Sequence, residues 1–105
     1  MKNIHIIKNS DITSALLAAP EGHRHLRLAL TTNDGDTVVL QEATVAAIVR
    51  AYTTVKTHPA KKVVKMVSAK PAGLKEGYAE DQLIEMDVDD ADVVAELTAL
   101  LKNAR

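Results

Sequence analysis

Hydrophobic and polar residues alternate with a period of two in the stretch that follows Gly22. Leu26, Leu28 and Leu30 alternate with smaller or more polar residues, which is typical of a half-buried strand. A second apolar run, residues 37–40, follows the turn sequence Asn-Asp-Gly. The pattern predicts a β-hairpin.

The register of this hairpin depends on the length of its loop. A two-residue loop would place Val38 and Leu40 on the face that carries the histidine and arginine side chains. A three-residue loop pairs Leu30 with Val38, and the same register pairs Leu28 with Leu40. Only this register gathers the large apolar residues on one face, so we predict the three-residue loop, with Gly35 in the left-handed position of a G1 bulge.

Apolar residues at spacings of three and four predict an amphipathic helix from Glu42 to Lys56. It ends before Pro59, since the residue that precedes a proline avoids the helical region. The stripe that we expect it to bury consists of Val45, Ile48, Val49, Tyr52 and Val55.

Two further helices are predicted from the same spacing. A short one begins at Ser10 as N-cap, ends at Ala19 and is stopped by Pro20. The last runs from Asp90 to Asn103. The residues of this last helix that we expect to face inward are Val93, Val94, Leu97, Leu100 and Leu101.

Three other segments read as strands, namely 3–7, 61–68 and 80–88. The predicted order is β-α-β-β-α-β-β-α, an α+β domain with a mostly antiparallel sheet and the helices on one face. The first six elements match the order of a split βαβ, or ferredoxin-like, core. A chain of 105 residues is expected to form one domain, residues 1–105.

Composition excludes several chemistries. The chain has no cysteine, which rules out disulfides, zinc–thiolate sites, iron–sulfur clusters and thiol nucleophiles. It has no Phe or Trp, so Val, Leu, Ile, Ala and Met must form the core. We expect a cytoplasmic protein without a membrane span, because no stretch reads as a signal peptide or reaches membrane-spanning length.

Charge is segregated along the chain although the formal net charge is −1. Residues 43–75 contain seven Lys and Arg and no acidic residue, whereas residues 76–101 contain nine Asp and Glu and no Lys or Arg. The two blocks neutralise each other either within one hairpin or between molecules.

Basic side chains supply the candidate sites. The possible anion-binding or partner-binding residues are Arg24, Arg27, Lys56, His58, Lys61, Lys62 and Lys65.

Tyr78, in a Gly-flanked loop, either anchors an interface or folds back over the core. His23 and His25 provide two imidazoles, fewer than a metal site needs, so we assign no metal ligand and read them as the polar start of a strand. The acidic stretch 87–92 fits capping of the last helix rather than a calcium loop.

No spacing in the sequence predicts catalysis. The chain contains no G-x-S-x-G, P-loop or G-x-G-x-x-G motif, and we expect neither an enzyme nor a cofactor. The leading hypothesis is a non-catalytic domain that acts by protein–protein association, as a homo-oligomer such as a homodimer. The alternatives are a module that binds nucleic acid or another anion through the basic residues, and a metal site centred on the histidines.

Overall fold

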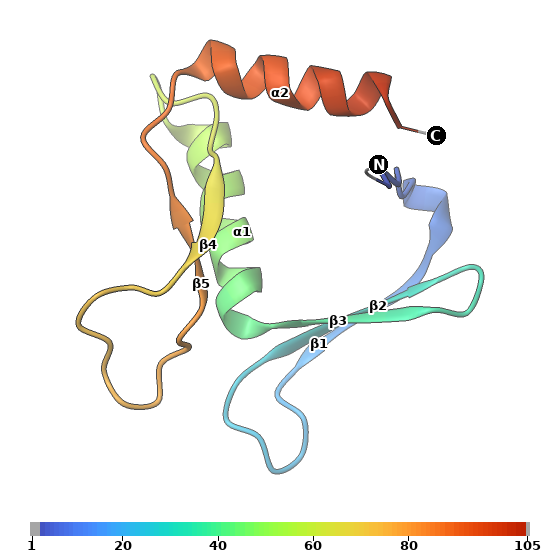
Figure 1. Ribbon diagram of the computed structural model, residues 1–105. Helices are drawn as coiled ribbons and strands as arrows, with labels where there is room; N and C mark the ends of the chain where they lie inside the picture. Colours follow the sequence, from blue (N-terminus) through green and yellow to red (C-terminus); the bar gives the residue numbers. More distant parts are fainter. Residues whose placement is uncertain (1–2, 105) are drawn as a thin grey trace.

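Antiparallel strands and two helices make up the chain, which confirms the α+β class (Figure 1). The computed structural model describes residues 3–104. The elements are the 3₁₀ turn η1 (Asn9–Asp11), β1 (Ile12–Ala18), β2 (Arg27–Thr32), β3 (Thr37–Gln41), α1 (Glu42–Thr57), β4 (Met66–Ala69), β5 (Gln82–Glu85) and α2 (Asp90–Lys102). From β2 onward their order follows the sequence-based prediction.

The β2–β3 hairpin has the predicted register. Leu28 lies opposite Leu40, and Leu30 lies opposite Val38. Gly35 has φ +92°, and its N–H donates to the carbonyl of Thr32 at 3.0 Å. The three-residue loop and the left-handed glycine are therefore both confirmed.

Residues 3–20 differ from the prediction. Residues 3–8 have no regular secondary structure, so the strand expected at 3–7 is absent. The segment expected to form a helix is strand β1, which pairs antiparallel with β2. Asp11 ends the short turn before it, where its carboxylate accepts the N–H of Lys8 at 2.9 Å. Pairing with the apolar strand β2 outweighs the helix propensity of the Ala and Leu residues in this segment.

The described strands form two sheets rather than one. β1, β2 and β3 form a three-stranded antiparallel sheet, which we call the N-terminal sheet, and β4 pairs only with β5. A ferredoxin-like core is not confirmed. The strand predicted at 61–68 is shorter, Met66–Ala69, and the one predicted at 80–88 is Gln82–Glu85.

Helix α1 packs on β4–β5 through its small side chains. Ala47, Ala51 and Thr54 face the hairpin, and Ala47 is the one buried residue among residues 3–104, with 4% of its surface exposed. The stripe that the sequence predicted to be buried is centred about 140° from Ala47 around the helix axis. Ile48, Val49 and Tyr52 are exposed, with Tyr52 at 65%, whereas Val45 and Val55 are half-buried. The expectation that the whole stripe is buried is therefore wrong. Small side chains allow the helix to approach the hairpin closely, and the exposed large apolar ones point elsewhere.

The chain has an open shape. The N-terminal sheet adjoins the N-terminal end of α1, whereas α2 begins beside its C-terminal end (Figure 1). The radius of gyration is 16.0 Å, compared with about 13 Å for a compact chain of this length. Among the described elements, α2 makes only sparse contacts with the rest. Its stripe, expected to face inward, is instead largely exposed, with Leu97 at 56%.

Candidate functional site

The lysines that follow α1 are engaged with neighbouring groups. Lys61 forms an ion pair with Glu85 of β5, as expected for antiparallel pairing of the two charge blocks. Lys65 pairs with Glu96 of α2 at 2.8 Å, and Lys62 Nζ donates to the carbonyl of His58 at 3.1 Å. The two charge blocks thus meet within one chain at these positions.

His58 organises the chain at the C-terminal end of α1. Its N–H donates to the carbonyl of Thr54 at 2.9 Å, which closes the helix. Its Nδ1 accepts the N–H groups of Ala60 and Lys61 at 3.0 and 2.9 Å. The imidazole therefore stabilises the turn after the helix, and Nδ1 is occupied by backbone donors.

Arg24 and Arg27 lie at the other end of α1, in and after the loop of residues 19–26. Arg27 donates to the carbonyls of His25 and Leu26 at 3.3 and 3.1 Å. Glu42 at the start of α1 accepts the N–H of Leu26 at 2.6 Å. About 20 Å of helix separates this end from Lys56, so the candidate basic residues form two separate groups.

His23 and His25 belong to the same exposed loop. His25 Nδ1 lies 3.8 Å from Glu42 Oε1. Within residues 3–104, no three His, Cys, Asp or Glu side chains gather in a group that could hold a metal ion. His25 thus has the Glu42 carboxylate as an acidic neighbour.

The acidic stretch before α2 is placed as a helix N-terminus. Asp89 occupies the N-cap position, but its side chain makes no capping hydrogen bond. Asp90 and Asp92 lie in the first turn, where negative charge interacts favourably with the helix dipole. The expected interaction of acidic residues with the helix dipole agrees with this arrangement. The expected capping hydrogen bond from an aspartate side chain is not formed.

Tyr78 lies in the long loop between β4 and β5. Its side chain is 63% exposed, so it does not fold back over the core. Its N–H donates to the carbonyl of Lys75 at 3.2 Å, in a turn that includes Gly77 at φ +87°. The ring is accessible from solvent.

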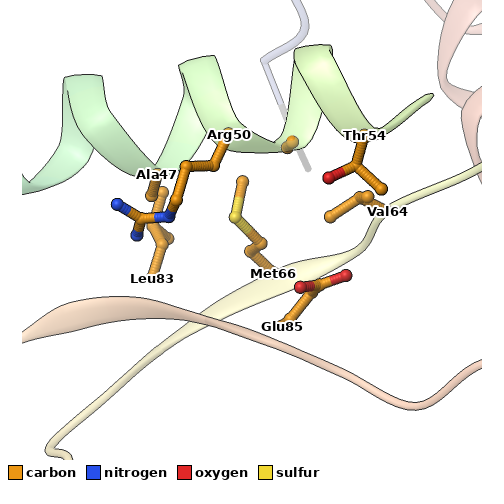
Figure 2. A pocket seen from close by; sticks show the side chains of 8 residues that line it. Ala47, Arg50, Thr54, Val64, Met66, Leu83 and Glu85 are labelled. Atoms are coloured by element: carbon orange, nitrogen blue, oxygen red, sulfur yellow. The ribbon is translucent and has the colours of Figure 1, made fainter. Parts of the chain in front are cut away.

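A small pocket lies between α1 and the β4–β5 hairpin. It has a volume of about 170 Å³ and lies between Ala47, Arg50 and Thr54 of the helix and Leu83 and Glu85 of β5 (Figure 2). Ligand pockets usually enclose about 300–1,000 Å³. The pocket is therefore a gap in the packing of helix on hairpin, too small for a typical cofactor or drug-sized substrate.

The N-terminal sheet carries one mainly apolar face, which has Thr32, opposite Ile12, at one end. Direct pairing places Ala15 beside Leu30, and Leu30 beside Val38. We call this surface the apolar sheet face; it consists of Ala15, Leu17, Leu28, Leu30, Val38 and Leu40. None of the six is buried. The opposite face is mixed and includes Ser, Thr, Arg and Gln side chains.

Two exposed helical surfaces accompany this face. The α1 stripe presents Ile48, Val49 and Tyr52, and the α2 stripe presents Val94, Leu97 and Leu101. The sequence pattern located both stripes and assigned them to the core. No local signal in the sequence distinguishes an apolar stripe that is buried in the chain from one that is exposed, so the exposure of these stripes was missed.

Comparison with protein-family models, with curated proteins and with solved structures found no match. No helix in the described part of the chain is long and apolar enough to cross a lipid bilayer. The apolar surfaces are the main feature of this chain from which a function can be argued.

Proposed function

We propose that this chain acts by protein–protein association, as a homo-oligomer whose core is completed by contacts between copies. The observation that carries the proposal is its accessible surface of 8,697 Å². A compact monomer of the same mass exposes about 5,700 Å². The chain thus exposes about 3,000 Å² more than a self-sufficient fold of its size.

This excess is larger than the surface that one chain of an obligate homodimer usually buries. Obligate homodimers bury about 2,000–5,000 Å² in total, or about 1,000–2,500 Å² from each chain. Large apolar residues of the three surfaces contribute to the excess, including Leu17, Val38, Tyr52 and Leu97. Isolated apolar residues are common on protein surfaces, but contiguous faces of this extent are typical of interaction sites.

The other functional classes have less support. An anion or nucleic-acid site requires the basic residues to converge, and Arg24 lies at the opposite end of α1 from Lys56. Lys61 and Lys65 are paired with carboxylates. The proposal is therefore a non-catalytic association domain, which we place in the cytoplasm because a cysteine-free chain suits a reducing compartment.

Urea unfolding at several protein concentrations tests the proposal. If folding requires association, each tenfold rise in concentration adds about 1.4 kcal/mol to the apparent stability of a dimer, and the unfolding midpoint rises. A midpoint that stays constant while the concentration changes would show that one chain folds alone, and would overturn the proposal.

A further inference from the structure

We infer that the apolar sheet face of one copy is covered by the α2 stripe of a second copy, and that the exchange is reciprocal. This inference rests on the proposed association and specifies its geometry. A helix and a sheet each need a partner for their apolar side, and helix on sheet is one of the standard layer arrangements. In this chain, neither surface is buried, and α2 lies apart from the N-terminal sheet (Figure 1).

The dimensions of the two surfaces agree. Helix α2 has 13 residues and is about 20 Å long. Strand β2, at the centre of the N-terminal sheet, has six residues and spans about 20 Å. A helix with side chains is about 10–12 Å across, and three strands at about 4.8 Å spacing make a sheet about 14 Å wide. One helix is therefore sufficient to cover this face.

The connection before α2 prevents it from covering its own sheet. Strand β5 passes Ala47 at Leu83 and reaches Thr54 at Glu85, so it runs toward the C-terminal end of α1 (Figure 2). The N–H of Met86 donates to the carbonyl of Lys65 at 2.8 Å, which fixes the chain there. α2 then begins beyond this point (Figure 1).

Reversal of α2 would not bring it onto the sheet. It would have to pass along all of α1, which is about 24 Å long, before it reached the sheet. At about 20 Å, α2 would lie beside α1 instead. The exposed ion pair between Lys65 and Glu96 adds a weak contact that favours the present direction of α2. Helix α2 of a second copy is not tied to this sheet by the connection after β5, so it can reach the apolar sheet face.

Charge does not oppose this docking. The N-terminal sheet contains one charged residue, Arg27, and it lies on the mixed face with Ala18 and Gln41. The polar side of α2 carries Asp92 and Glu96, about 100–140° from Leu97 around the helix. Asp90, the first residue of α2, lies about 20° from Leu97 around the helix, but it is exposed and lies about 10 Å from Leu97 along the axis. The apolar stripe can therefore contact the apolar sheet face while the Asp90 carboxylate stays in water at the rim of the contact.

Cross-linking between single-cysteine variants tests the inference, because the natural chain has no cysteine. One sample carries Val38→Cys, on the apolar sheet face, and a tagged sample carries Leu97→Cys. The two are mixed, unfolded and refolded together, then treated with a short bismaleimide. The matched control replaces Val38→Cys by Val39→Cys, whose side chain lies on the opposite face and is also exposed.

We expect the mixed Val38→Cys and Leu97→Cys product to form several-fold more than the Val39→Cys product. A second pair guards against a variant that fails to fold: Leu17→Cys should cross-link to Leu101→Cys several-fold more than its neighbour Leu16→Cys does.

The other outcomes overturn either the helix-on-sheet docking alone or the docking together with the association. Equal yields from both faces in a sample of dimer mass, or efficient linkage of Val38→Cys to itself, overturn the helix-on-sheet docking and leave association intact. Linkage within one chain of a Val38→Cys/Leu97→Cys double variant, in a sample of monomer mass, overturns both. A monomer without any cross-link also overturns both.

Discussion

Gly35 is the residue on which the β2–β3 turn depends. Its φ of +92° lies in the region that L-residues avoid. We predict that Gly35→Ala lowers the free energy of unfolding by about 1–2 kcal/mol, because a Cβ at positive φ is strained. Urea unfolding of the two proteins at equal concentration measures the difference.

Asparagine provides the control at this position. Asn adopts positive φ more readily than Ala, so Gly35→Asn should lose less stability than Gly35→Ala. Equal stability of Gly35→Ala and the natural protein would show that the turn does not hold this conformation in solution.

Asp34 gives the turn a pH dependence. The Thr32 hydroxyl, and then the backbone N–H of Asp36, donate to its carboxylate and hold the pKa of Asp34 below its usual value of 3.8. The charged form is thus favoured in the folded state. Its contribution to stability is present above pH 3.8 and is lost as the pH falls through the lower folded pKa.

Titration of the Asp34 carboxyl carbon by NMR tests this point. The carboxyl should titrate below its usual value in the natural protein, and Thr32→Val should move the pKa back toward that value, since it removes the main donor. A carboxyl that titrates at or above its usual value in the natural protein would contradict the hydrogen bonding seen here.

At the scale of elements, helix α2 offers the sharpest test. Leu97 lies at the centre of its exposed stripe, and Ala95 lies about 160° away around the helix. We predict that Leu97→Gln weakens association by about 3–6 kcal/mol per dimer, because both copies lose a buried leucine. Ala95→Gln should leave association nearly unchanged, since Gln and Ala are both good helix formers.

Sedimentation equilibrium of both variants gives the dissociation constants. A loss as large for Ala95→Gln as for Leu97→Gln would show that the apolar stripe of α2 is not the side that docks. Circular dichroism of both variants checks that the helix still forms.

The helices and strands differ in how far the sequence alone predicts them. The β2–β3 register and both long helices follow from local patterns: a two-residue or a three-to-four-residue period, a turn glycine and a proline. Strand β1 does not, because its Ala and Leu residues suit a helix equally well. Its conformation is decided by β2, a partner some 15 residues away along the chain.

The candidate site was predictable only in part. The basic residues were located by type, but their division between the two ends of α1 depends on tertiary structure. The stripes on α1 and α2 were recognised as apolar and assigned to the core. A hydrophobic period identifies a face that must be covered, but it carries no information about whether the cover comes from the same chain.

At the scale of the whole molecule, the charges and the apolar surfaces make separate contributions. Lys61 pairs with Glu85 and Lys65 with Glu96 inside one chain. Because these pairs do not cross the proposed interface, we predict that the dimer persists from low salt to about 0.5 M NaCl, where the Debye length is about 4 Å. Analytical ultracentrifugation across this range measures the mass. Dissociation on addition of salt would place the charge blocks, rather than the apolar faces, at the interface.

The central claim is that one copy of this chain does not bury its own core. Static light scattering after size exclusion, at concentrations from about 1 μM to about 100 μM, tests it directly over the range in which a micromolar dimer would dissociate. We expect twice the chain mass of 11.3 kDa over most of this range. A mass of 11.3 kDa at every concentration would contradict it.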